Sequence, residues 1–366
     1  MPSSRSVTGR QCSKGGRDVR GERAPVMRIV RFLSGRLVSG LVVLIGVSVL
    51  IFVLARVIPG DPARLALGPT APPEQVEALR ARLDLDAPLL VQYGRFVTNA
   101  LRYDFGISLY TNRPVAQDIA ESFPATFELV LLSTFFVVVF GVGLGVLGSR
   151  YRDTWLDSVL RLFSVIGVVA PTFVWAIFFM LVFSFWFELF PVGGRLSEGM
   201  LVPPDVTGFY LIDTLLSGHW YGFFDAVHHL ILPAIALALP ALGQTARLTR
   251  TNLAEVDRAP YIETARAYAF REDEIALKFA LRPAAIPTLT IIGLEFVALF
   301  GNAFLVETVF VWPGMARYGV QTILHKDLNG IVATVLVMAL LFVLVNALVD
   351  FIVTFVNPRI RLAWRS

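Results

Sequence analysis

The stretch Tyr261–Pro283 reads YIETARAYAFREDEIALKFALRP and lies between two strongly apolar runs of the chain. In its first half, closely spaced alanines surround Glu263 and Arg266 within about three turns, which favours a short helix with small side chains over much of its surface. The second half begins with acidic residues and has basic residues before Pro283, which predicts another helix. We therefore expect a polar helix-turn-helix that is joined directly to two apolar segments.

The rest of the chain has the composition of an integral membrane protein. Of its 366 residues, 55% are hydrophobic and 16% are charged, and the mean hydropathy is +0.67. Soluble domains are less apolar than this, and a helix needs about 20 predominantly apolar residues to cross the hydrocarbon. The sequence predicts an all-α membrane protein with about six transmembrane helices, at Leu37–Val57, Thr126–Gly148, Leu160–Phe187, Leu230–Gln244, Ile286–Leu305 and Ile331–Phe355.

The segment Leu230–Gln244 is the least regular of the six because Pro233 and Pro240 interrupt it. Prolines are tolerated in spanning helices where neighbouring groups satisfy the freed carbonyls. A re-entrant or interfacial segment is the alternative to a complete span.

Arginine and lysine are concentrated in four parts of the chain: the first 36 residues, the loops after the second and fourth predicted spans, and the C-terminal end. The positive-inside rule places these parts, and with them both termini and the Tyr261–Pro283 stretch, in the cytoplasm. The chain then divides into a basic cytoplasmic tail (1–27), a first transmembrane helix (28–58), a periplasmic loop region (59–123), a core (124–358) that holds the polar loop at 257–287, and a C-terminal cytoplasmic tail (359–366).

The sequence carries no motif of an enzyme, a nucleotide site or a metal site. GxxxxGK[ST], HExxH, paired CxxC and GxSxG are all absent, and Cys12 is the sole cysteine. His228 and His229 are adjacent, point to different faces of a helix and favour interfacial hydrogen bonding. We expect no catalytic residue, metal or cofactor. The basic loops and the lipid bilayer account for the pI of about 9.4 without a nucleic acid partner.

Few ionisable residues lie within or near the predicted spans. Glu295 is the deepest of them, and it shares a helical face with Asn302 two turns away. An intramembrane carboxyl of this kind marks a possible translocation pathway, and it is also the polar centre that a self-contained channel or a membrane-embedded enzyme would use. Glu128, Glu307 and Asp350 lie near helix ends, where a hydrated or ion-paired side chain is as plausible as a functional one.

Glycine recurs through FGVGLGVLGS, at Gly141, Gly143, Gly145 and Gly148. Such spacing lets helices approach one another closely and predicts tight packing in a bundle. A backbone-lined ion filter is the alternative, but it requires irregular backbone within a pore.

Several segments resemble one family. YIETARAYAF, followed by LRPAAIP, is similar to the EAA loop of inner-membrane permease subunits of binding-protein-dependent ABC importers. Glu263 and Ala265 match the Glu and Ala of that motif, Thr264 replaces its middle alanine, and Pro287 matches its closing proline. Further segments resemble the dipeptide, oligopeptide and nickel permease branch with a long first periplasmic loop: GVSVLIFVLARVIPGDPA (46–63), LILPAIALALPALGQTARLTRTNLAEV (230–256), VETVFVWPGMARYGVQTI (306–323) and VNPRIR (356–361).

The resemblance implies the transmembrane domain of a type I ABC importer, with a coupling helix that docks on an ATPase. The expected partners are a second homologous permease, two cytoplasmic ABC ATPases, which would hydrolyse the ATP, and an extracytoplasmic solute-binding protein. The complex would move peptides or peptide-like solutes inward across a bacterial-type inner membrane. The implied coupling residues are Glu263, Thr264, Ala265, Arg266 and Ala269, and the possible pathway residues are Glu295 and Asn302.

Besides Thr264, this chain departs from the family pattern at three positions. Ala269 stands where the family usually has glycine, so the alanine must either keep a negative φ or accept strain. Pro283 replaces a common asparagine, and Glu295 stands where a neutral polar residue is frequent. The last two bear on helix geometry and on substrate preference, for which peptides, nickel complexes, sugars and glutathione all remain open. A solvated connector is the alternative to a coupling role for the polar loop.

Overall fold

The computed structural model describes residues 23–57, 64, 71–82, 87–204 and 206–356. Its regular structure there is helical, apart from one isolated β-bridge between Ile107 and Pro114. The expectation of an all-α fold is therefore confirmed. Most of the expected N-terminal tail and all of the expected C-terminal tail lie outside the described residues. The chain forms two compact units, Met1–Val42 and Val43–Ser366, and the boundary falls within α1 (Arg23–Val57).

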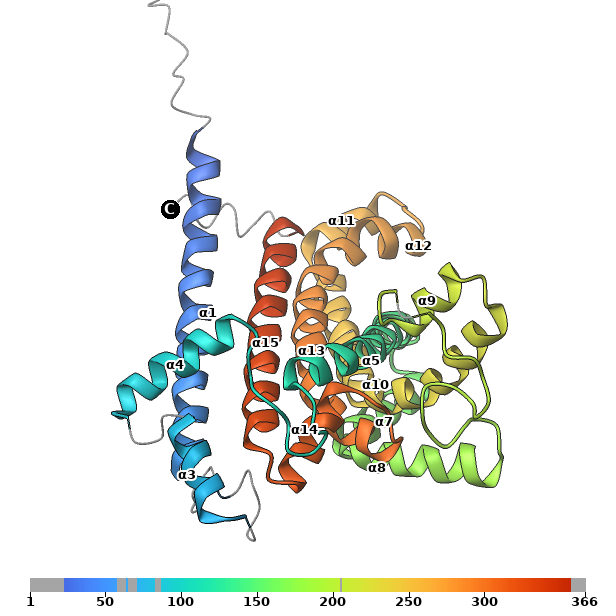
Figure 1. Ribbon diagram of the computed structural model, residues 1–366. Coiled ribbons are helices and arrows are strands. Elements are labelled where there is room, and N and C mark those ends of the chain that lie inside the picture. The colour runs from blue at the N-terminus through green and yellow to red at the C-terminus, as the bar shows by residue number, and fades with distance from the viewer. Residues whose placement is uncertain (1–22, 58–63, 65–70, 83–86, 205, 357–366) are drawn as a thin grey trace, which may run out of the picture. The chain divides into compact units, whose positions relative to one another are not determined.

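The second unit is a helical bundle. Figure 1 shows α11 and α12 together at one end of α10 and α13, with α14 at the opposite end of α13. Its elements after α1 are α3 (Pro73–Arg82), α4 (Leu89–Leu101), α5 (Val115–Phe136), the π turn η2 (Val137–Gly141), α6 (Val142–Arg150), α7 (Trp155–Val169), α8 (Thr172–Phe179), the π turn η3 (Met180–Trp186), α9 (Tyr210–Leu216), α10 (Trp220–Asp257), α11 (Pro260–Ala267), α12 (Glu272–Glu274), the π turn η4 (Ile275–Ala280), α13 (Leu281–Val309), α14 (Met315–Leu324) and α15 (Leu328–Val356).

The number of transmembrane helices agrees with the prediction of about six. Five helical segments in the described part of the chain are long and apolar enough to cross a membrane, and a bent pair of helices brings the number to six. The five are Ser34–Leu54, Val115–Arg150, Trp220–Asp257, Pro283–Val309 and Leu328–Ile352, and the pair is Trp155–Val169 with Thr172–Trp186.

Two predicted spans differ in detail from the structure. The expected span Leu160–Phe187 is bent by 105° between α7 and α8. Pro171 follows Ala170, which takes the extended conformation that a residue before proline prefers, so the helix ends there. The second span starts at Val115 rather than Thr126, because the polar, amphipathic start of α5 is helical but contributes little hydropathy.

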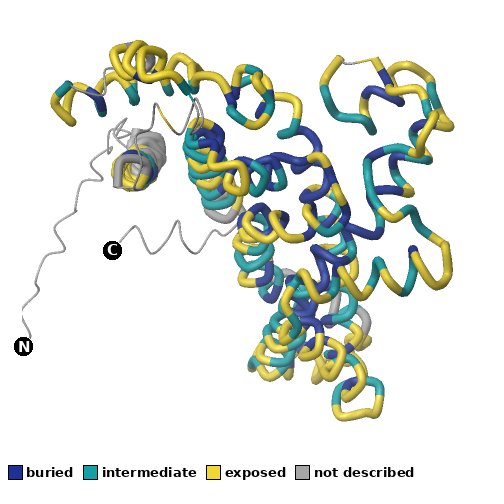
Figure 2. The backbone as a smooth tube through the Cα atoms, turned by 60° about the horizontal axis from the view of Figure 1, so that its bottom comes forward, coloured by how far each residue is buried: buried dark blue, intermediate teal, exposed yellow. Residues whose placement is uncertain are grey.

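Helix α10 forms the centre of the bundle. It runs uninterrupted for 38 residues through Pro233 and Pro240, and 72% of its apolar window is buried. The expected span Leu230–Gln244 is therefore the middle of one long, continuous helix. It packs against α5, α6, α7, α8, α9 and α13. Figure 2 shows the buried positions gathered where the helices meet, while many outward-facing positions are exposed.

Three of the four glycines in FGVGLGVLGS lie against α10, which confirms the packing interpretation. A Cβ on Gly145 would stand 2.5 Å from Cβ of Thr249 and 2.8 Å from the carbonyl oxygen of Ala246. Gly141 and Gly148 make similar but looser approaches to α10, whereas a Cβ on Gly143 would meet nothing within 4 Å. The backbones of these helices therefore approach each other more closely than a side chain would allow.

We expect Gly145→Ala to lower the free energy of unfolding by about 1–3 kcal/mol, because the added methyl group overpacks a contact with backbone. Thermal unfolding of the purified protein in detergent measures the change. Gly143→Ala adds the same methyl group in open space and is the matched control. Equal unfolding midpoints for the two variants would contradict this account of the α6–α10 contact.

Candidate functional site

The polar stretch folds as the expected helix-turn-helix. Helix α11 begins at Pro260, whose fixed φ suits the first helical position, and Glu263 lies in its first turn. The sequence predicts a separate second helix, but the structure has none: α12 and the π turn η4 run directly into α13. The π turn ends just before Pro283, where the prolyl nitrogen removes a helical donor.

The turn between the two helices depends on a left-handed residue. Ala269 has a φ of +58°, so of the two alternatives the alanine takes the strained conformation. The N–H of Ala269 donates to the carbonyl of Arg266 (2.9 Å) and the N–H of Phe270 donates to the carbonyl of Ala265 (3.3 Å). This is the hydrogen-bond pattern of a Schellman motif, which usually has glycine at the left-handed position. An alanine there costs about 1 kcal/mol.

The inner side of α11 packs on the ends of the two long helices. Ile262 and Ala265 are buried in a cluster with Leu253 of α10, Ile275 of η4 and Ala284 of α13. Ala265, one of the implied coupling residues, thus faces the bundle rather than the outer side of the loop. Its small side chain lets α11 lie close to η4.

Arg266 ties the two halves of the loop together. Its Nη2 donates to Oδ1 of Asp257 at the end of α10 (2.5 Å), and its Nε donates to Oε1 of Glu272 in α12 (2.9 Å). The hydrogen bonds to Glu272 and then Asp257 hold the pKa of the guanidinium above its ordinary value. Because all three side chains are partly exposed, the network adds only modest stability. Its geometric effect is to connect three helical segments.

The outer side of the loop presents both charge and aromatic surface. Glu263 and Thr264 are exposed, as expected for residues that dock on a partner. Tyr261, Tyr268 and Phe270 of the same loop are also exposed, and Tyr268 is 77% exposed. The resemblance to the EAA motif did not identify these aromatics as candidate contact residues. Three aromatic residues within ten positions of a polar loop could have indicated a contact surface. Exposed aromatics are typical of protein–protein contact surfaces.

Glu295 and Asn302 lie on one face of α13 but do not form a closed polar centre. Glu295 is half-buried and forms a side-chain hydrogen bond with Gln244 of α10, whereas Asn302 is exposed. Neither lines the apolar cavity of about 400 Å³ between α13, α14 and α15, which lies along Val297 and Phe304.

The other acids near the helix ends have structural partners. Glu128 of α5 accepts a hydrogen bond from Arg195 (2.5 Å) within a buried ion pair, which confirms the ion-paired alternative for this residue. Glu307 is fully buried and accepts hydrogen bonds from Oγ1 of Thr126 (2.6 Å) and the backbone N–H of Arg317 (2.8 Å) at the start of α14. Asp350 is half-buried on α15.

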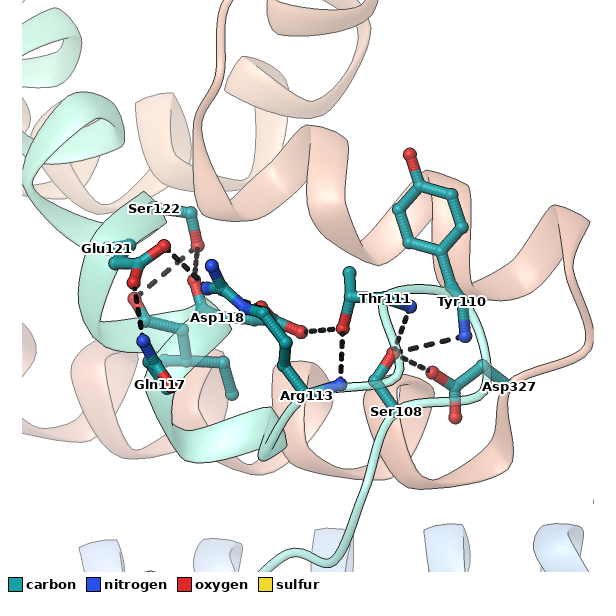
Figure 3. A network of polar contacts seen from close by, with 10 residues as sticks. Ser108, Tyr110, Thr111, Arg113, Gln117, Asp118, Glu121, Ser122 and Asp327 are labelled. Atoms are coloured by element: carbon teal, nitrogen blue, oxygen red, sulfur yellow. Dashed lines mark hydrogen bonds and ion pairs between the residues drawn. The ribbon is translucent and has the colours of Figure 1, made fainter.

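A second polar network fixes the segment before α5, at the α14 end of the bundle (Figure 3). The buried Asp327, just before α15, accepts a hydrogen bond from Oγ of Ser108 (2.5 Å). Asp118 in the first turn of α5 accepts hydrogen bonds from Oγ1 of Thr111 (2.5 Å) and Nε of Arg113 (3.0 Å). Sequence reasoning missed this network, since its partners are separated by up to 219 residues.

We expect Ala269→Gly to stabilise the loop by about 1 kcal/mol, because glycine adopts a positive φ without steric strain. Amide hydrogen exchange of residues 265–270 should slow by about fivefold if it proceeds by local opening. The matched control is Ala267→Gly, which removes a methyl group from within α11 and should accelerate exchange. Faster exchange in Ala269→Gly would show that the turn does not carry this strain.

Comparison with known proteins identifies the family. Residues 137–362 match the family described as "Binding-protein-dependent transport system inner membrane component", and residues 29–130 match the N-terminal part of such a membrane component. The probable D,D-dipeptide transport system permease protein DdpB of Escherichia coli K12 is 40% identical over 322 residues, which are 88% of this chain and 95% of that protein.

Two other relatives are also similar to this chain over nearly their whole length. The di/tripeptide transport system permease protein DppB of Pseudomonas aeruginosa is 39% identical over 335 residues, covering 91% of this chain and 99% of that protein. The glutathione transport system permease protein GsiC of Shigella flexneri is 34% identical over 333 residues, with the same coverage. This chain therefore belongs to the family of inner membrane components of binding-protein-dependent transport systems, and it is a non-enzymatic, multi-pass permease subunit of an ABC importer with a type I transmembrane domain.

Proposed function

We propose that this permease moves peptides or peptide-like solutes inward, driven by ATP hydrolysis in partner ATPases that act through the Tyr261–Arg282 loop. The relatives support the substrate class, because they include proteins named as dipeptide, di/tripeptide and glutathione permeases. The channel and enzyme alternatives have no comparable support.

The observation that carries the coupling role is the way the loop is attached. Its inner face packs on Leu253 and Ala284, and Arg266 forms a hydrogen-bonded ion pair with Asp257. The loop is therefore attached to the ends of both α10 and α13. A push on its exposed face is therefore transmitted to two spanning helices rather than absorbed by a flexible connector. An ATPase that binds one arrangement of these helices more tightly biases the equilibrium between two cavity orientations.

The proposed orientation places both termini and the loop in the cytoplasm, following the distribution of arginine and lysine. The ATPases then bind the outer side of α11, at Glu263 and Thr264 and the neighbouring aromatics. A second homologous permease completes the pathway, two ATPases drive it, and an extracytoplasmic solute-binding protein delivers the solute at the opposite end of the bundle.

Along the pathway we assign Glu295 and Asn302 to the surface that faces the solute. Both lie on one face of α13 and neither is sealed in the core of this chain. A partly exposed carboxyl in a spanning segment is stable where it meets water or a polar partner. A water-filled space between two permease subunits provides that environment.

We expect Glu263→Lys to reduce ATP-driven uptake by about tenfold or more while membrane insertion is retained, because the reversed charge repels a complementary docking surface. The loss of an acid from the first turn of α11 costs the fold only about 0.3–1 kcal/mol. Uptake and ATP hydrolysis are measured together in proteoliposomes. Glu255→Lys makes the same charge reversal on an exposed residue of α10, before the loop. Equal uptake by Glu263→Lys and the unmodified protein would argue against the coupling role.

The same variants test the proposed assembly. The tagged chain, purified from gently solubilised membranes, should carry with it a second permease and two ATPase chains, and Glu263→Lys should lose the ATPases while Glu255→Lys retains them. Recovery of the chain alone from active membranes would leave the loop as a connector and contradict the proposed complex.

We expect Glu295→Gln to change the KM for uptake or the range of peptides carried, because it removes a charge from the proposed pathway surface while keeping the side-chain shape. Competition between peptides of different charge measures the range. Leu294→Ala is the control, since Leu294 is the adjacent residue and is 58% exposed on another face of α13. Unaltered KM and substrate range would make Glu295 a structural residue.

A further inference from the structure

A basic cavity lies outside both the coupling loop and the proposed pathway residues. It has a volume of about 470 Å³ and lies between α6, the turn that follows it, the middle of α7 and the last third of α10. Four arginines and one aspartate line it together with apolar side chains: Arg152, Arg161, Arg247, Arg250 and Asp153, with Leu144, Leu160 and Val165.

One buried carboxylate organises the arginines. Asp157 accepts two hydrogen bonds from Arg250, at 2.6 Å from Nε and 2.7 Å from Nη2, and a third at 3.0 Å from Nη2 of Arg161. Arg250 is thus engaged in a bidentate pair that joins α10 to α7. The side chain of Arg161 is 58% exposed, so its guanidinium has further donors that face solvent.

The remaining charges leave the cavity positive. Arg247 is exposed and makes a long contact of 3.5 Å with Gln244, and Arg152 lies 3.6 Å from Asp153. Four arginines set against Asp153 and Asp157 give a net charge of +2. Guanidinium groups that share a concave surface bind a phosphate well, because each presents paired donors in a fixed plane.

The surroundings of the cavity indicate the edge of the membrane. Tyr151 and Trp155, which flank the lining residues Arg152 and Asp153 in the sequence between α6 and α7, are 45% and 77% exposed. Exposed tyrosine and tryptophan at the end of a spanning segment are typical of the headgroup region of a bilayer. Beyond them the outer side of α7 is apolar and exposed, at Val159, Leu162, Phe163 and Ile166.

We propose that this cavity binds the phosphate of an anionic phospholipid, with the start of an acyl chain against Leu144, Leu160 and Val165. Arg161 and Arg247 contact the phosphate, while Arg250 and Asp157 hold the cavity in shape. A net charge of +2 favours a lipid with a net negative headgroup over a zwitterionic one. The apolar wall and the exposed aromatics favour a lipid over a free anion, which would use only the charged part of the site.

The test uses the delipidated complex in neutral detergent, titrated with phosphatidylglycerol or phosphatidylcholine and followed by native mass spectrometry. Phosphatidylglycerol should be retained in preference, and the double variant Arg161→Gln/Arg247→Gln should bind it about 30-fold more weakly. Arg102→Gln/Lys326→Gln removes the same charge from exposed positions that neither line the cavity nor lie in the coupling loop, and should keep the preference.

Three results would overturn the proposal. The first is equal retention of phosphatidylglycerol and phosphatidylcholine, and the second is an equal loss of phosphatidylglycerol binding in both double variants. The third is displacement of the lipid by millimolar inorganic phosphate, which would assign the cavity to a soluble anion. A second measurement needs no substitution at the arginines: brominated phosphatidylglycerol should quench tryptophan fluorescence more than brominated phosphatidylcholine. Trp155→Phe should remove the difference, and its persistence would place the lipid elsewhere.

Discussion

The close approach of surrounding helices to α10 is the contact on which this permease depends. Gly145 and Gly141 bring α6 and η2 against Thr249 and Thr245, and Gly243 of α10 meets the backbone of α7 at Ser164. In hydrocarbon there is little hydrophobic gain from bringing two apolar helices together, so packing has to supply the free energy of association. Small residues on both sides of the contacts allow that packing.

The central position of α10 bears on the proposed coupling role of the polar loop. The loop begins at the last residue of α10 and ends in α13, and these two helices pack directly on each other. The buried cluster around Ile262 and the bridge through Arg266 add short-range attachment at both ends. A displacement of α11 therefore reaches the helix that contacts most of the bundle.

Hydropathy and helical pattern were sufficient to predict the all-α fold, the six apolar segments and the helix-turn-helix. They failed where a single backbone position decides the geometry, because Pro171 breaks α7 from α8. At Ala269 the sequence left a negative φ and a strained positive φ open, and the structure has the positive one. Hydropathy and helical pattern failed also for buried partners, because nothing near Glu128 in the sequence points to Arg195, 67 residues away. Such pairs depend on tertiary packing, whereas the exposed loop motif depends mainly on local sequence.

The acidic residues on the spanning helices differ in how completely their carboxylates are paired within the chain, and this difference bears on the proposed pathway. Glu128 has a buried arginine, and Glu307 has a hydroxyl and the N–H groups at the start of α14. Both are satisfied within the chain. The partner that the structure gives Glu295 is the neutral amide of Gln244, and the carboxyl is only half-buried. A charged group in that position would be unstable against lipid, but it is stable against water or a second subunit. The half-buried position of Glu295, with a neutral partner, is thus the observation that supports the proposed pathway role of this face of α13.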